Sequence, residues 1–239
     1  MLVTAGHVTG LLQSKHFCVP QSGEIKPLNC RISRFGHADV PLAADSIDVS
    51  IIHLTERQAD DLSAYHFVQL SEIEYETVLH DPQGYDAFMG YPASKNKKKL
   101  GANGIKPKLF PYVGVQIQRA ELEQHNRPFE THLGIEFGTR VMGFGGNIVR
   151  LPDPKGTSGC PVWSLGKIGE IAGGSRKTQL VGICIERKGN ALIAVRAWLI
   201  LQVVREAFPD LAGVIEQFPN VQLRNAGAVP QRQLILNER

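Results

Sequence analysis

The chain lacks the features that would assign it to a membrane, secreted or nucleic-acid-binding class. Its longest apolar run, AWLILQVV, is far too short to cross a membrane. The N-terminal MLVTAGHV has neither the charged start nor the long apolar core of a signal peptide. The formal net charge is only +3, from 26 basic and 23 acidic residues, which gives no argument for a nucleic-acid partner. We therefore expect neither a membrane nor a nucleic acid as a partner.

Cysteine is also scarce. The four cysteines, Cys18, Cys30, Cys160 and Cys184, have neither the spacing of a metal site nor the density of a secreted disulfide framework. The eight histidines include no pair at a recognisable metal-ligand spacing. We therefore expect free thiols, a reducing and hence cytoplasmic location, and no metal or other cofactor.

Short runs of β-forming residues make up much of the chain and lie between scattered glycines and prolines. Many short strands with frequent turn signals indicate an all-β sandwich or barrel. The runs are HFCVP, CRISRF, DVSIIHL, YDAFMGYP, KLFPYVGVQI, THLGIEFG, QLVGICIE and NALIAVR. GANG, at residues 101–104, predicts a hairpin turn between two of them.

One segment has the spacing of a helix. In residues 196–208 apolar side chains recur at helical intervals, and we expect Pro209 to stop this helix. HDPQG, at residues 80–84, is the best candidate for a linker between two halves. From about Asn220 the chain turns polar and patternless, so we expect a loose tail there.

Two further motifs resemble phosphate-binding sequences, and both have a better interpretation. KNKKK, at residues 95–99, follows GYPAS and is expected to be a solvated loop. MGFGGN, at residues 142–147, lacks the Lys-Ser/Thr end that would hold phosphate and magnesium. It is expected to form a hairpin of a barrel.

PKGTSGCPVW, at residues 154–163, places Ser158 between two glycines. A serine hydroxyl needs a base, a group that orients the base, and donors for the oxygen that becomes negative. His7, in LVTAGHV, follows a short β-type run with small residues that leave room for its ring. Asp48, in DSIDVSIIHL, stands at the head of an apolar strand, where a half-buried carboxylate could orient a base or could simply cap the strand.

Three blocks, LVTAGHV, DVSIIHL and GTSGCPV, resemble in order and approximate spacing the catalytic blocks of the chymotrypsin-like (trypsin-fold) serine peptidases. AFMGYP is similar to the strand that opens the family's second barrel, and QLVGICIE to the strand that walls the substrate cleft. Residues 196–208 resemble the C-terminal helix. LPDPKGTSGCPVW looks most like the disulfide-poor bacterial trypsin-like peptidases. The resemblance covers residues 1 to about 208.

The resemblance implies an all-β fold of two six-stranded-type antiparallel β-barrels with a C-terminal helix. The N-terminal barrel would span residues 1–82, the C-terminal barrel and helix residues 83–208, and a tail residues 209–239. Only six residues precede His7, where the family has about two strands. Either the start was assigned too late or the protein has an incomplete first barrel, and we favour the first interpretation because an open barrel would leave unpaired edge strands.

The resemblance also implies a role for each residue of the three blocks. His7 is the general base and then the acid, Asp48 orients His7, and Ser158 attacks the substrate carbonyl and becomes acylated. The backbone amides of Gly156 and Ser158 form the oxyanion hole, and glycine at position 156 suits a loop that needs a positive φ.

Four residues are implied to lie at the specificity pocket. Its floor falls near Pro152 and Asp153. An exposed Asp153 would favour Lys or Arg at the cleavage site, but PDP is equally a rigid turn. Ile185 and Glu186 of the QLVGICIE strand are the other candidates, and Ile185 replaces a serine that many members use to bind the aspartate.

Two departures from the family bear on function. Thr157 stands where activatable members carry an aspartate, so no zymogen switch of that kind is expected. Cys160 replaces a glycine and is interpreted as a packed residue rather than a reactive thiol.

The leading hypothesis is a serine endopeptidase with polypeptide substrates. The alternatives are a catalytically silent trypsin-fold binding module and a serine esterase that uses the same site. The natural substrate and the oligomeric state are left open.

Overall fold

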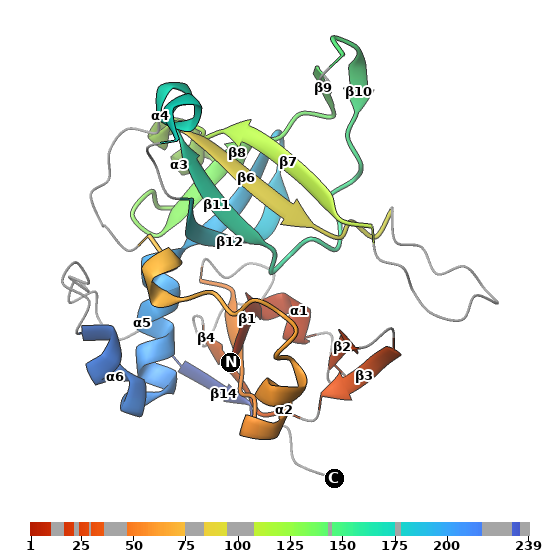
Figure 1. Cartoon of the computed structure of the whole chain (residues 1–239). Coiled ribbons are helices and arrows are strands. Elements are labelled where there is room, and N and C mark those ends of the chain that lie inside the picture. The colour runs from red at the N-terminus through yellow and green to blue at the C-terminus, as the bar shows by residue number, and fades with distance from the viewer. Residues whose placement is uncertain are drawn as a thin grey trace. The chain divides into compact units, whose positions relative to one another are not determined.

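The computed structural model of the chain divides into two units, each described here by itself (Figure 1). The first unit comprises Met1–Glu76 with Ala197–Arg239, and the second comprises Thr77–Arg196. The structure describes residues 1–10, 17–21, 24–28, 30–35, 47–74, 84–94, 108–142, 145–174, 178–216 and 231–234. For residues 17–21, 24–28 and 231–234 it describes the backbone alone.

A four-stranded antiparallel sheet forms the centre of the first unit. Its strands, in spatial order, are β1 (Leu2–Ala5), β5 (Val49–Ile52), β4 (Ile32–Phe35) and β14 (Gln231–Leu234). Every residue of β4 and β5 is buried, because each strand has neighbours on both sides and packed side chains on both faces. A separate hairpin joins β2 (Phe17–Gln21) to β3 (Glu24–Leu28). The short helix α1 (Gly6–Gly10) follows β1 directly.

A pair of C-terminal helices also belongs to the first unit. All residues of α5 (Ala197–Ala207) from Ala197 to Val204 are buried, as expected of a helix that is apolar over most of its surface. The ring of His53, just after β5, lies 4.5 Å from the ring of Phe208 and connects the helix to the sheet. Pro209 ends α5 and begins α6 (Pro209–Glu216), since proline is tolerated in the first turn of a helix.

The second unit is built on a six-stranded antiparallel sheet that curls into a half-barrel (Figure 1). Its strands, in spatial order, are β7 (Phe110–Val115), β6 (Tyr85–Gly90), β11 (Pro161–Gly166), β12 (Gln179–Lys188), β13 (Ala191–Arg196) and β8 (His132–Glu136). The register shifts within the β11–β12, β11–β6 and β12–β13 pairs, and such bulges bend strands.

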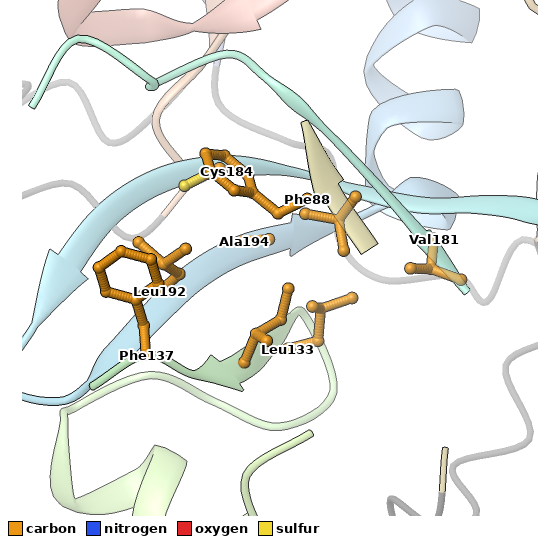
Figure 2. Packing of buried hydrophobic residues seen from close by; sticks show 9 residues of the cluster. Phe88, Leu133, Phe137, Val181, Cys184, Leu192 and Ala194 are labelled. Carbon is orange, nitrogen blue, oxygen red and sulfur yellow. The ribbon is translucent and has the colours of Figure 1, made fainter. Parts of the chain in front are cut away.

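The curl brings the two edge strands, β7 and β8, into contact. Gln116 forms an isolated bridge with Ile135, and the Tyr112 hydroxyl donates to the carbonyl of Glu136 at 2.8 Å. Gly114 permits this approach, because a Cβ there would lie 2.6 Å from the Ile135 side chain. The concave face holds the core, in which side chains from β6, β12 and β13 point toward those of Leu133 and Phe137 (Figure 2).

The remaining elements lie outside the two main sheets. β9 (Arg140–Met142) pairs with β10 (Ile148–Arg150) as a hairpin of its own. The short helices are α2 (Glu56–Asp61), the 3-10 turn η3 (Leu70–Glu72), α3 (Arg119–Gln124) and α4 (Ile168–Gly173). No helix among the described residues is long and apolar enough to span a membrane.

The expected β fold is confirmed in its coarse form: antiparallel sheets, one curled six-stranded half-barrel and a C-terminal helix pair. Each run predicted as a strand overlaps one. β9 and β10 flank the MGFGGN segment and pair as a hairpin, although they form a two-stranded sheet of their own rather than part of the curled sheet. KNKKK, GANG and most of HDPQG lie outside the described residues.

The C-terminal segment differs from the expectation. Residues 209–239, assigned to a tail, contain α6 and β14, and β14 pairs with β4. The helix at residues 197–207, expected with the second half of the chain, groups with the first unit. No periodic pattern marks β14, because its position depends on pairing with a strand about two hundred residues earlier in the chain.

Candidate active-site residues

The pairing of β1 with β5 determines the position of His7. Ala5 lies opposite Val49 at the end of the ladder, and the Gly6 N–H donates to the Asp48 carbonyl at 2.8 Å just beyond it. His7 follows Gly6 directly and therefore lies beside Asp48, although the two residues are 41 positions apart in the sequence.

Asp48 binds His7 through both of its carboxylate oxygens. Oδ1 accepts from the His7 backbone N–H at 2.7 Å, and Oδ2 lies 2.6 Å from the ring Nδ1. An ionised carboxylate only accepts hydrogen bonds, so Nδ1 carries the ring proton and Nε2 is the basic nitrogen. Asp48 is buried, whereas the His7 side chain is 32% exposed, so the carboxylate holds an imidazole that stays partly accessible to solvent.

Two backbone features allow this close contact. A Cβ at Gly6 would lie 2.8 Å from Asp48 Oδ1, so any larger residue there would push the carboxylate away from His7. Asp48 itself has φ of +24°, which an aspartate adopts more readily than most residues. Such backbone strain tends to occur at functional sites, where the surrounding structure holds it in place.

Ser158 stands in a loop that two glycines shape. Gly156 has φ of +89° and Gly159 has φ of +87°, a region that side-chain-bearing residues rarely enter. Between them, Thr157 donates from its N–H (3.0 Å) and its hydroxyl (2.6 Å) to the Pro154 carbonyl. The loop is therefore fixed on both sides of the serine.

The Ser158 loop presents two amides that have no backbone acceptor. Among the described residues, neither the Gly156 N–H nor the Ser158 N–H donates to a carbonyl, although the neighbouring Gly159 N–H donates to Cys184 at 2.7 Å. Gly156 is exposed, whereas Ser158 is half-buried. The Ser158 hydroxyl donates to the Ile185 carbonyl at 3.1 Å.

His7 and Asp48 are thus brought together in the first unit, and Gly156, Ser158 and Ile185 in the second. Comparison with models of protein families and with curated proteins found no match. The function of the protein must therefore be inferred from these residues, and the meeting of Ser158 with His7 stays a prediction.

The predicted pocket residues fall in two places in the second unit. Half-buried Pro152 and exposed Asp153 precede the serine loop, and Asp153 Oδ1 accepts from the Lys155 N–H at 3.1 Å, as in a tight turn. Ile185 is buried on β12. The next residue along β12, Glu186, is half-buried and has a charged partner.

Glu186 forms an ion pair that sequence reasoning missed. Its Oε1 accepts from Arg127 Nε at 2.7 Å and lies 2.5 Å from Nη2. The Arg127 side chain is only 6% exposed, so two charged groups neutralise each other where water is scarce. The charge of Glu186 is therefore balanced by the protein itself, which weakens its candidacy as the group that selects a cationic substrate side chain.

Two cysteines lie close to Ser158, and both are free thiols. Burial raises the pKa of Cys160 to about 11 and also raises the pKa of the fully buried Cys184. The reactive form of cysteine is the thiolate, so neither sulfur is a competing nucleophile near neutral pH. The interpretation of Cys160 as a packed residue agrees with its position against the core.

A buried polar cluster beside His7 was also missed. The cluster consists of Arg34, Thr9 and Ser50, each at most 2% exposed. The Thr9 hydroxyl is hydrogen-bonded both to Arg34 and to Ser50. The one signal in the sequence was an arginine inside the apolar run CRISRF.

Among the described residues no group of three His, Cys, Asp or Glu side chains is arranged to hold a metal ion.

Proposed function

We propose that the protein is a serine endopeptidase of the chymotrypsin-like kind that cleaves polypeptides with Ser158, His7 and Asp48. The observation that carries the proposal is the pair of hydrogen bonds that one buried carboxylate accepts from the backbone N–H and the ring Nδ1 of His7. A histidine held in this way has its basic Nε2 on a partly exposed ring, as a general base requires.

The loop around Ser158 supports the proposal from the other unit. Gly156 and Ser158 each have an amide N–H that no backbone carbonyl accepts within the described part of the chain, and donors of this kind stabilise an oxyanion. The positive φ of Gly156 turns the chain sharply just before the serine. We infer that these two amides bind the substrate carbonyl oxygen as it becomes negative.

The proposed reaction has two stages. His7 Nε2 takes the proton of the Ser158 hydroxyl while Oγ attacks the carbonyl carbon, and the protonated ring then passes that proton to the leaving amine. The acyl group stays on Ser158. His7 Nε2 then takes a proton from a water molecule whose oxygen attacks the acyl carbon. As the bond from that carbon to Ser158 Oγ breaks, the protonated ring of His7 gives this proton to Oγ and the carboxylic acid is released. Throughout, Asp48 keeps the Nδ1 proton in place and stabilises the cationic ring.

The same proposal includes the two-barrel architecture. The curled sheet of the second unit would be the C-terminal barrel, and the sheet β1-β5-β4-β14 would belong to the N-terminal one. The free thiols of Cys30, Cys160 and Cys184 support a reducing compartment such as the cytoplasm.

One contact favours the catalytically silent alternative. The Ser158 hydroxyl donates its single proton to the Ile185 carbonyl, so in this state a backbone acceptor already uses that proton. If this arrangement persists when substrate is bound, Ser158 would be unreactive and the fold would serve as a binding module. Activation would require the hydroxyl to rotate toward His7.

A covalent probe distinguishes these functions. Incubation with a fluorophosphonate should label the wild-type protein at Ser158, and Ser158→Ala and His7→Ala should abolish labelling. Ser164→Ala, which removes a buried serine hydroxyl from β11 in the same unit, is the matched control and should label normally. Absence of labelling in the wild type would favour the binding module. Labelling with turnover of esters but not of peptides would identify an esterase.

A further inference from the structure

We propose that Arg34 is a positioning residue that acts on Asp48 and His7 through Thr9 and the Gly6–His7 peptide group. The catalytic consequence rests on the proposed function, whereas the chain of hydrogen bonds itself does not. Every link of this chain lies within the first unit.

The chain begins at a buried cation. Arg34, on β4, is 2% exposed, and its Nε donates to Thr9 Oγ1 at 2.8 Å while its Nη2 donates to the Thr9 carbonyl. Burial lowers the pKa of Arg34, but a guanidinium stays protonated in proteins. Within the described part of the chain no carboxylate forms an ion pair with this arginine. Burying a cation that has only neutral partners costs free energy, so the presence of Arg34 at this position calls for an explanation.

The position of the Thr9 proton follows from counting donors and acceptors. Thr9 Oγ1 donates to the Gly6 carbonyl at 2.8 Å, which uses its only proton. Ser50 Oγ lies 2.8 Å from the same oxygen and must therefore be the donor in that contact. With Arg34 and Ser50 donating to its two lone pairs, the Thr9 hydroxyl is saturated and its orientation is fixed.

The next link is a single peptide group. The Gly6 carbonyl that accepts from Thr9 and the His7 N–H that donates to Asp48 Oδ1 at 2.7 Å are the two ends of one amide. The hydrogen bonds therefore run without a break from the Arg34 guanidinium through Thr9 and this amide to the Asp48 carboxylate. Each bond polarises the next, so a cation at one end strengthens the bond to the anion at the other.

The expected effect of this chain is on the alignment of Asp48 with His7. A stronger bond from the His7 N–H holds Oδ1 in place, and the rigid carboxylate then keeps Oδ2 against Nδ1. Loss of Arg34 or of the Thr9 hydroxyl should loosen both contacts. Because about 1 Å of misplacement can cost roughly 10²-fold in rate, we expect labelling of Ser158 to slow by about tenfold or more.

The test uses nuclear magnetic resonance together with the fluorophosphonate probe. Arg34→Met and Thr9→Val should each move the His7 amide proton upfield and weaken or broaden the Nδ1 proton signal. Thr9→Ser, which keeps the hydroxyl, should restore both signals and the labelling rate. Ser33→Ala removes a buried hydroxyl bonded to His53 from the residue next to Arg34 and should leave the His7 signals unchanged.

The outcomes separate the inference from the proposed function. If Arg34→Met does not fold, the comparison of Thr9→Val with Thr9→Ser decides. Both variants keep the arginine, Thr9→Val keeps the shape of threonine without its hydroxyl, and Thr9→Ser keeps the hydroxyl without the methyl group. Unchanged His7 signals in folded Thr9→Val would overturn the inference. Shifted signals in a protein that the probe does not label at all would support the hydrogen-bonded chain and reject the peptidase.

Discussion

Replacement of Gly156 by alanine should affect acylation of Ser158 far more than it affects stability. The added Cβ meets two penalties. Gly156 has φ of +89°, where a side chain costs about 1–2 kcal/mol. The new Cβ would also lie 3.2 Å from Ala93 Cβ and 3.3 Å from Ala93 N. The Ala93 N–H is itself fixed to the Lys155 carbonyl at 2.8 Å, so the neighbour cannot move away easily.

The loop should therefore relieve the strain by rotating the peptide around Gly156, which turns its amide away from the oxyanion. Loss of one such donor typically costs about 10²–10³ in rate, or about 2.7–4 kcal/mol of transition-state stabilisation. The assay is the second-order rate constant for phosphonylation of Ser158, measured by mass spectrometry, beside the free energy of unfolding in urea.

Gly146 provides the matched control. Its φ is +75°, and a Cβ there would meet nothing within 4 Å, so Gly146→Ala carries the backbone penalty without the steric one. We expect it to lose about 1–2 kcal/mol of stability and to be phosphonylated at the wild-type rate. If Gly156→Ala were also phosphonylated at the wild-type rate, the Gly156 amide would not be part of an oxyanion hole.

Three further predictions concern single groups. Asp48→Asn should keep the fold but hold His7 in the wrong tautomer, and the rate of peptide cleavage should fall by about 10⁴-fold; a fall of less than tenfold would contradict the role of Asp48. Glu186→Gln should leave Arg127 with a weaker acceptor and lower the free energy of unfolding by about 1–3 kcal/mol, without altering the preferred cleavage-site residue. For Cys160, whose pKa of about 11 exceeds the ordinary 9.0, alkylation of the folded protein should be slow near neutral pH and should speed up about tenfold per pH unit. Because the unfolded thiol ionises first, the free energy of unfolding measured in urea should fall as pH rises from about 9 to about 11, and a flat profile would be contrary to burial of this thiol.

The sequence predicted strands well where one face of the strand is apolar. YDAFMG and NALIAVR were assigned correctly because β-branched and aromatic residues dominate them. The strand β11, PVWSLG, was missed for a physical reason. Its buried positions include Ser164 and Gly166, while Trp163 and Leu165 are only half-buried, so the alternation in the sequence does not match the alternation in burial.

Helices were predicted only where packing gives them an apolar stripe. α2 buries no residue and therefore has no periodic pattern, although Thr55 and Gln58 form a capping box that the sequence does display. Pro209 was interpreted as a stop alone, because a sequence does not reveal whether a proline also begins the next helix.

For the candidate site, the sequence indicated candidate groups but not the side chains that bind them. The order His7, Asp48 and Ser158 followed from three short blocks. The Arg127 partner of Glu186 and the Arg34–Thr9 chain depend on side chains from distant segments, and an arginine in an apolar run indicates only that some partner must exist. A buried charge in a sequence thus predicts a contact without naming it.

The proposed mechanism requires that the ring of His7 contacts both Asp48 and Ser158. A crystal structure of the protein after phosphonylation tests it most directly through the distance from His7 Nε2 to Ser158 Oγ. We predict a hydrogen-bond distance of about 2.6–3.2 Å, with the phosphoryl oxygen beside the Gly156 and Ser158 amides. A structure in which His7 faces a different cleft from Ser158 would contradict the account.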